Sequence, residues 1–211
     1  MHVFCDASSD TIGYITYLRS VGRVEAHVAF INASSRVAPR MATSIPRLEL
    51  NAAVEAAENA TFIYNELSRK PNAVHLYSDS MVVMGYINNK EKRFARCVER
   101  RVNLVLSHTD SAQWHYVHTT VNPADIATRP HTPRELLQTT WFTGPEQMMR
   151  ADFQPEHMDT RADTSVQVLT LPEEVIEQLA LQTTASSIDS LTYRVASRKS
   201  ELFEILSVVR V

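Results

Sequence analysis

The chain has 211 residues, of which 44% are hydrophobic and 21% charged, and its formal net charge is −3. This length and composition predict a globular protein with one substantial core, in one or two domains. No stretch approaches the roughly 18 consecutive apolar residues of a membrane span, and the charged residues near the start exclude a usual signal peptide. Cys5 and Cys97 fit neither a disulfide framework nor a zinc site, which favours a reducing compartment.

Three strands are predicted at the start of the chain. Residues 2–6 alternate in strand fashion, residues 12–18 are rich in β-branched and aromatic side chains, and a third strand is expected over 24–31. The short connections between these strands predict an antiparallel meander. Residues 32–44 are expected to form a loop that leads into a long helix.

The long helix is predicted to have Pro46 near its first turn and to end before Pro71. After it, the chain predicts a buried parallel strand, two helices, a strand and a last helix, over residues 74–78, 80–87, about 92–107, 113–117 and from 122 onward. This order predicts a mixed sheet with helices on both faces. In such sheets, ligands gather at the carboxyl ends of the central strands.

Four acidic residues are placed at predicted strand ends or in predicted first turns of helices: Asp6, Glu49, Asp79 and Asp125. We expect their carboxylates to converge on one edge of the sheet. Carboxylates that lie close together raise one another's pKa, so such a cluster needs cations to stay ionised. Mg²⁺ or Mn²⁺ suits hard oxygen ligands, and two such ions can activate water and stabilise the leaving 3′ oxygen of a phosphodiester.

Each of these acids also has a structural interpretation when taken alone. Asp6 precedes Ala-Ser-Ser and can be a turn former. Glu49 and Asp125, in predicted first turns, can complement a helix dipole, and Asp79 can simply end its strand. The joint order and placement of all four residues favours the metal site.

Charge is uneven along the rest of the chain. Basic residues cluster before and on the helix expected from about residue 92: Lys90, Lys92, Arg93, Arg96, Arg100 and Arg101. They form either a solvated helix face or a contact for phosphates. Residues 141–190 hold 2 basic against 9 acidic residues, which predicts an acidic linker or extension, and helical spacing returns from Ser190.

Six segments together resemble the ribonuclease H domain of BEL/Pao-type LTR retrotransposon polyproteins. They are Val-Phe-Cys-Asp-Ala-Ser-Ser (3–9), Ser-Arg-Val-Ala-Pro (35–39), Ile-Pro-Arg-Leu-Glu-Leu (45–50), Tyr-Ser-Asp-Ser (77–80), Asn-Pro-Ala-Asp-Ile-Ala-Thr-Arg (122–129) and Trp-Phe-Thr-Gly-Pro-Glu (141–146). The resemblance implies an RNase H-like α/β fold over residues 1–148, with a five-stranded sheet of order 3-2-1-4-5. An acidic linker over 149–189 and a C-terminal helix over 190–211, leading towards an integrase region, are expected to follow.

The resemblance also implies a function and its residues. Asp6, Glu49, Asp79 and Asp125 fall on the family's metal-binding carboxylates, which use two Mg²⁺ or Mn²⁺ ions to cut the RNA strand of RNA/DNA hybrids. A basic protrusion of these enzymes grips the hybrid, and Arg36 lies in a block beside the site. The expected nucleic-acid contacts are therefore Arg36, Lys92, Arg93, Arg96 and Arg100, with Ser8, Ser9 and Ser80 as candidates for reading the 2′-hydroxyl.

The expected partners are an RNA/DNA hybrid and the reverse transcriptase and integrase regions of the parent polyprotein, with no membrane. The expected location is the cytoplasm, within virus-like particles, or the nucleus. Thr120 stands about where many ribonucleases H have a His, with His118 two residues before it. The alternative function is therefore a catalytically weak or inactive retroelement-derived module that binds nucleic acid or a protein. A related integrase or exonuclease fits poorly, because the acids run Asp, Glu, Asp, Asp.

Overall fold

The computed structural model describes residues 1–22, 26–39, 44–89 and 94–159. The chain divides into two compact units, one of residues 1–92 with 98–170 and one of residues 93–97 with 171–211. The fold that follows is that of the first unit. The predicted C-terminal helix over 190–211 and most of the predicted acidic linker lie outside the described residues.

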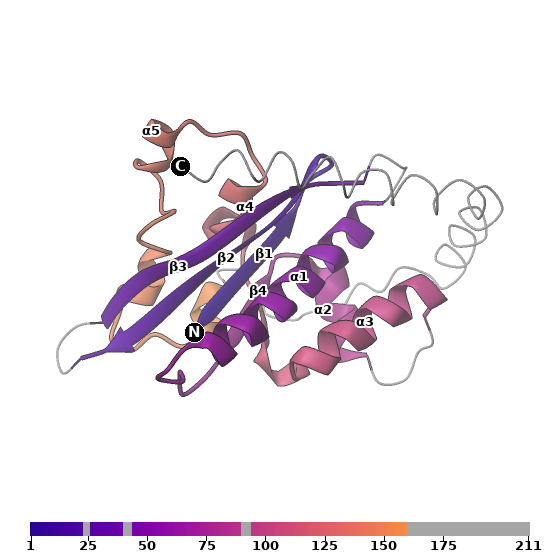
Figure 1. The fold of residues 1–211 in the computed structure, drawn as a ribbon, viewed down its shortest axis with the longest axis horizontal. Coiled ribbons are helices and arrows are strands. Elements are labelled where there is room, and N and C mark those ends of the chain that lie inside the picture. The colour runs from indigo at the N-terminus through magenta and orange to yellow at the C-terminus, as the bar shows by residue number, and fades with distance from the viewer. Residues whose placement is uncertain (23–25, 40–43, 90–93, 160–211) are drawn as a thin grey trace. The chain divides into compact units, whose positions relative to one another are not determined.

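A five-stranded sheet of order β3-β2-β1-β4-β5 forms the centre of this unit (Figure 1). The strands are β1 (His2–Ala7), β2 (Thr11–Val21), β3 (Ala26–Val37), β4 (His75–Ser78) and β5 (Trp114–Tyr116). The first three pair antiparallel because short turns join them, whereas β4 joins β1, and β5 joins β4, in parallel after helical connections. The predicted strand order is thus confirmed.

Helices cover the sheet. They are α1 (Ile45–Glu66), α2 (Met81–Asn88), α3 (Arg96–His108), α4 (Ala124–Ala127) and α5 (Pro133–Leu136), with short 3₁₀ turns η1 (Ser111–Gln113), η2 (Thr119–Val121), η3 (Glu146–Met149) and η4 (Pro155–Met158). None of the described helices has the length and apolar character that crossing a membrane requires.

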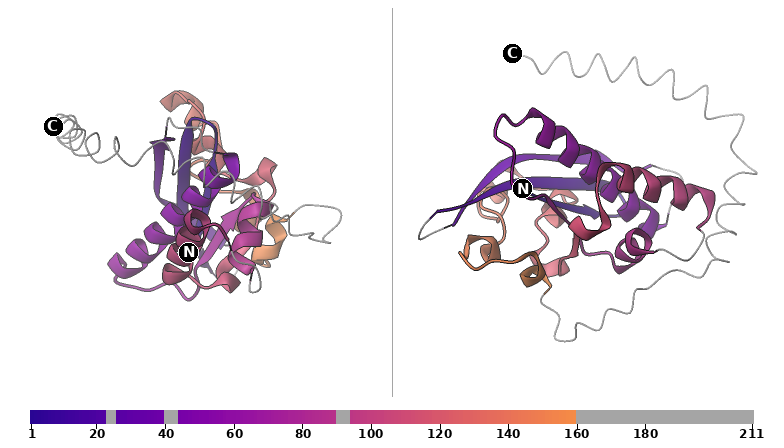
Figure 2. Two further views of the ribbon diagram at one scale, coloured as in Figure 1. Left: turned by 90° about the vertical axis from the view of Figure 1, so that its right-hand side faces the viewer. Right: turned by 90° about the horizontal axis from the view of Figure 1, so that it is seen from below.

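Two helices reach β2 from opposite faces of the sheet. On one face, Asn59 of α1 donates a hydrogen bond to the Thr16 hydroxyl at 2.8 Å. On the other, α4 packs against Gly13. Residues an odd number apart in a strand face opposite sides, so α1 and α4 sandwich the sheet, and Figure 2 shows α1 lying along one side of it.

The core on the α4 side is built on stacked aromatic rings. Phe4 and Tyr77 lie face to face with their ring centroids 4.4 Å apart, and both side chains are fully buried. Later segments of the chain close over these rings, because Met148, Phe153 and Met158 belong to the same buried cluster. The packed core therefore continues beyond residue 148, while the predicted domain boundaries stay a prediction.

The structure corrects three local predictions. The expected loop over 32–44 is wrong at its start, because β3 continues to Val37 and pairs with β2 as far as Thr11. The first turn of α1 contains no acidic residue, so Glu49 lies beyond it and does not serve as a first-turn acid. The helix expected from about residue 92 begins at Arg96 in the described part, with 90–93 outside it.

Three histidines on neighbouring strands predict acid sensitivity. Burial lowers the pKa of His2 to about 2 and that of His75 to about 4, and it also lowers the pKa of His115. The unfolded chain therefore binds more protons below about pH 6.5, and the contribution of these groups to stability is lost as the pH falls through that value. These histidines are partly accessible to solvent, which reduces the effect of their lowered pKa values on stability. We therefore expect the free energy of unfolding to drop by about 2 kcal/mol between pH 7 and pH 5.

Urea denaturation at a series of pH values measures this effect. His115→Gln removes one of the three histidines and also the hydrogen-bond partner of the His75 ring, which lies 3.1 Å away. In this variant the profile of the free energy of unfolding against pH should fall less steeply between pH 7 and pH 5. His131→Gln, at an exposed position, is the control and should leave it unchanged. An equally steep profile in His115→Gln would contradict the assignment.

Candidate metal-binding carboxylate site

Parallel pairing of β1 with β4 brings two of the predicted acids side by side. Cys5 pairs with Ser78, so the residues that follow them, Asp6 near the end of β1 and Asp79 directly after β4, fall at the same edge of the sheet. Asp125 lies in the first turn of α4, as predicted, and α4 packs against β1 and β2. Glu49 reaches this edge from α1, where its carboxylate accepts a hydrogen bond from Ser80, the residue after Asp79.

The electrostatics of the site link the four carboxylates through Asp6. Burial raises the pKa of Asp6, and the negative charge of Asp125 raises it further. Burial likewise raises the pKa of Asp79, with the charge of Asp6 as the next cause. The pKa of Glu49 is raised by burial and then by Asp79 and Asp6. The carboxylates therefore repel one another across a partly desolvated site.

Two hydroxyl groups hold carboxylates of this site in place. Thr128 donates from Oγ1 to Asp6 Oδ2 at 2.7 Å and is itself buried at the end of α4. Ser80 donates from Oγ to Glu49 Oε2 at 2.5 Å, and the same oxygen caps α2 by accepting from Val83 N–H. Thr128 was not among the predicted site residues, although it lies in the quoted segment 122–129.

Arg129 is a second functional candidate that sequence reasoning missed. Its Nη2 lies 2.8 Å from Asp125 Oδ1 in an ion pair between residues four apart. Arg129 could have been identified from the sequence, because it lies four residues after Asp125, which was already assigned to the site, and side chains four residues apart on a helix are neighbours.

The donor chemistry suits divalent metal ions, but the arrangement of the side chains does not yet form a complete metal site. All four acids offer hard oxygen ligands of the kind that Mg²⁺ and Mn²⁺ prefer. Within the described residues, however, no three His, Cys, Asp or Glu side chains are placed to hold one ion. One oxygen of Asp125 is engaged by Arg129 and one oxygen of Glu49 by Ser80.

The predicted nucleic-acid contacts fall in four places, one of which is Ser80 at the start of α2, beside Glu49. Ser8 and Ser9 form the turn between β1 and β2, where the Ser8 hydroxyl bonds to that of Thr11 at 2.9 Å and Ser9 is exposed. Arg36 lies on β3, not in a loop, and forms a salt bridge of 2.7 Å with Glu55.

The remaining contacts were predicted on the basic helix. Arg96 and Arg100 are exposed on α3, whose Val98, Val102 and Val105 are buried as predicted. Lys92 and Arg93 lie outside the described residues. The role of all these residues in binding stays a prediction.

The segment around the expected His lies next to the site. Thr120 bonds through its hydroxyl to His118 Nδ1 at 2.8 Å, at the start of η2. Hydrogen bonds from the side chains of Thr119 and Asn122 oppose the rise in the pKa of Asp79. Thr119 and Asn122 are therefore the residues of this segment that act on a predicted metal ligand.

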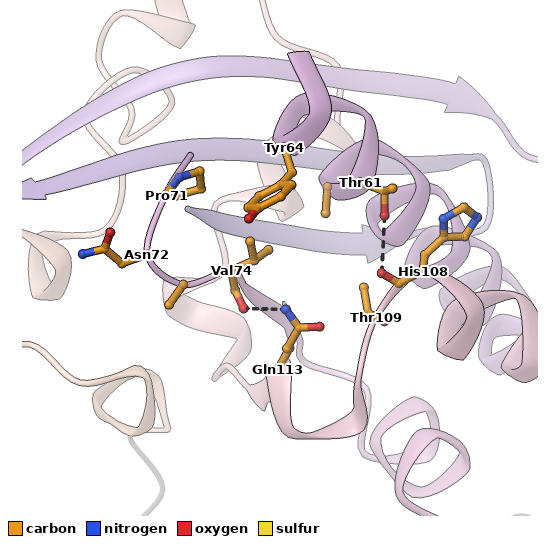
Figure 3. A pocket seen from close by; sticks show the side chains of 10 residues that line it. Thr61, Tyr64, Pro71, Asn72, Val74, His108, Thr109 and Gln113 are labelled. Atoms are coloured by element: carbon orange, nitrogen blue, oxygen red, sulfur yellow. Dashed lines mark hydrogen bonds between the residues drawn. The ribbon is translucent and has the colours of Figure 1, made fainter. Parts of the chain in front are cut away.

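A pocket of about 340 Å³ lies elsewhere on the same unit (Figure 3). Its lining includes Tyr64, Val74, His108 and Gln113, and the Gln113 amide donates to Val74 O at 3.2 Å. Val74 precedes β4, whereas Asp79 follows it, so the pocket and the carboxylates lie at opposite ends of this strand. It is not part of the carboxylate site.

The mixed sheet and its order define the class of this unit, an RNase H-like α/β fold. The model of the family described as Pao retrotransposon-like RNaseH-like domain matches residues 1–80. The predicted resemblance is thereby confirmed over a stretch that contains Asp6, Glu49 and Asp79, and it supports a nuclease-type function. Asp125 lies outside this match. No sequence among curated proteins matches the chain.

Several solved structures are similar, each over 60% of this chain. RNase H1 of the halophilic archaeon Halobacterium salinarum shares 15% identity, with 92% of that chain covered and a TM-score of 0.42. The N-terminal RNase H domain of a Mycobacterium tuberculosis protein, solved as a fusion with maltose binding protein, shares 13%, with 90% covered and a TM-score of 0.39. LC11-RNase H1 in complex with an RNA/DNA hybrid shares 14%, with 91% covered and a TM-score of 0.42.

Proposed function

We propose that this protein is a metal-dependent endoribonuclease that cuts the RNA strand of RNA/DNA hybrids, as one region of a retrotransposon polyprotein. The observation that carries the proposal is the meeting of partly buried carboxylates at the carboxyl ends of two parallel strands. Asp6, Glu49 and Asp79 each have a raised pKa, and among the described residues no basic side chain forms a salt bridge with any of the three. A site with this surplus of negative charge favours a multivalent cation.

Asp6, Glu49, Asp79 and Asp125 would hold the ions. When bound, two divalent ions supply an activated water and charge stabilisation for the leaving 3′ oxygen. The chain's own contribution is placement: Thr128 keeps one oxygen of Asp6 fixed by its hydrogen bond, and Ser80 keeps one oxygen of Glu49 fixed. Both hydroxyls are held by buried residues, so they limit the movement of the carboxylates before ions arrive.

Cutting of a labelled hybrid tests the proposal. With Mg²⁺ or Mn²⁺, the purified full chain should nick the RNA strand internally and leave 3′-hydroxyl ends, whereas single-stranded RNA, duplex DNA and samples with EDTA stay intact. Asp6→Asn should abolish the nicks. Asp10→Asn, an exposed turn residue four positions along the same segment, is the matched control and should cut as the wild type does.

Nicks that persist unchanged in Asp6→Asn would overturn the proposed mechanism. A wild-type chain that binds hybrid without nicking it, alone and when fused to a reverse transcriptase that presents the substrate, would instead favour the alternative of a non-cutting nucleic-acid-binding module. Arrangement within a polyprotein between reverse transcriptase and integrase regions, and a location in virus-like particles or the nucleus, remain part of the proposal.

A further inference from the structure

The ion pair between Arg129 and Asp125 stands at the edge of the carboxylate site. The Arg129 guanidinium Nη2 lies 2.8 Å from Asp125 Oδ1, and the side chain of Arg129 is 64% exposed and that of Asp125 is 31% exposed. Arg129 follows the end of α4 at Ala127, so its long side chain folds back towards the helix. The positive charge of Arg129 also reaches Asp6, whose pKa it lowers against the larger effect of burial. A cation of the chain thus lies beside one predicted metal ligand, Asp125, and acts electrostatically on a second, Asp6.

Asp125 is therefore engaged before any ion binds. Its Oδ1 is held by Arg129, and no three acids among the described residues are placed to hold one ion. Thr128, next to Arg129, is fixed from both sides, because its hydroxyl donates to Asp6 and also lies 3.0 Å from the Asp125 carbonyl. The backbone here is tethered, so the side chains of Asp125 and Arg129 are the parts that can rearrange.

We propose that Arg129 is a positioning residue that neutralises Asp125 in the metal-free protein, yields it to a divalent ion, and then binds a backbone phosphate of the nucleic acid. The inference rests on the proposed function. An ion pair this exposed is weak, so a divalent ion can displace it at small cost. The released guanidinium carries five donors in a planar fork, an arrangement that suits phosphate. Loading of metal would thereby create a substrate contact.

Two affinities measured on the full chain test this exchange. Arg129→Gln should bind Mn²⁺ about twofold to fivefold more tightly by calorimetry, since the competing cation is gone and an exposed ion pair has about this strength. The same variant should bind an RNA/DNA hybrid several-fold more weakly, by stopped-flow anisotropy recorded before cutting, in Mn²⁺ but not in EDTA. Arg129→Lys should restore part of the hybrid affinity. Arg134→Gln, another exposed arginine of this region, is the control and should change neither value.

Unchanged or weaker Mn²⁺ binding by Arg129→Gln would overturn the exchange, because the arginine would then not compete with the ion. An equal loss of hybrid affinity in Mn²⁺ and in EDTA would also overturn it, because phosphate binding would not depend on release from Asp125. These measurements do not require RNA to be cut. Failure of the wild type to nick hybrids would count against the proposed function alone.

Discussion

The Asp79→Asn variant is expected to lose hybrid cutting by at least about a thousandfold while it unfolds at a higher temperature than the wild type. Asn is nearly the same size as Asp but carries no charge, so it removes one ligand of the proposed ions. It also removes one negative charge from a partly buried site where burial and Asp6 both raise the pKa of Asp79. We expect the midpoint of unfolding to rise by about 2–4 °C, as about 1 kcal/mol does in a domain of this size.

The stability gain has a defined pH dependence. A carboxyl whose pKa is raised in the folded protein holds its proton more tightly than in the unfolded chain, so the wild type gains stability as the pH falls towards that pKa. The difference between Asp79→Asn and the wild type should therefore be largest at neutral pH and should shrink on acidification. Mn²⁺ should raise the melting temperature of the wild type more than that of the variant, because ligand binding stabilises only the state that binds.

Differential scanning calorimetry with the same cutting assay measures both effects. The matched control is Asp152→Asn, because Asp152 is exposed and its pKa is lowered by a hydrogen bond from Arg150. This variant should cut normally and should gain no stability. A variant at position 79 that is inactive but less stable than the wild type would argue that Asp79 supports the fold and not a metal site.

The Gly13→Ala variant is expected to lose about 1–3 kcal/mol of stability, and most of any nuclease activity with it. A Cβ atom at Gly13 would lie 2.7 Å from the Cβ of Ala127 in α4, closer than packed atoms approach. Gly13 also pairs with Asp6 across β1 and β2. Displacement of α4 would therefore move Asp125 away from Asp6, and Gly13→Val should do so more strongly.

A double-mutant cycle isolates this contact. Ala127→Gly removes the atom that the new Cβ would meet, so Gly13→Ala with Ala127→Gly should be more stable than the sum of the two single changes predicts. Ala29→Val, at an exposed position of β3, adds bulk to the same sheet and should be close to neutral. Strictly additive losses, measured by urea denaturation, would show that the close approach of α4 does not limit stability.

Local patterns were sufficient for most of the strands and helices, whereas the order of the sheet was predicted from the family resemblance. Alternation in β1 and β2, the long helical face of α1 and the short apolar run of β4 each express a local periodicity, and parallel pairing of β1 with β4 follows from the intervening helix. The placement of Asp6 and Asp79 at one edge could be inferred for the same reason, because Asp6 is the next-to-last residue of β1 and Asp79 directly follows β4.

Contacts between distant segments determined the end of β3, the packing of α4 and the orientation of the side chains at the site. The polar end of β3 is a strand because β2 offers it a pairing partner, which no pattern within 32–37 indicates. Glycine is required at position 13 because α4 packs so closely against it that a Cβ atom would clash with Ala127, a contact that the sequence pattern does not reveal. The chain order predicts where the acids sit along the backbone, but hydrogen bonds and charges from other segments orient the side chains. Thr128 therefore donates a hydrogen bond to Asp6, and Arg129 forms an ion pair with Asp125.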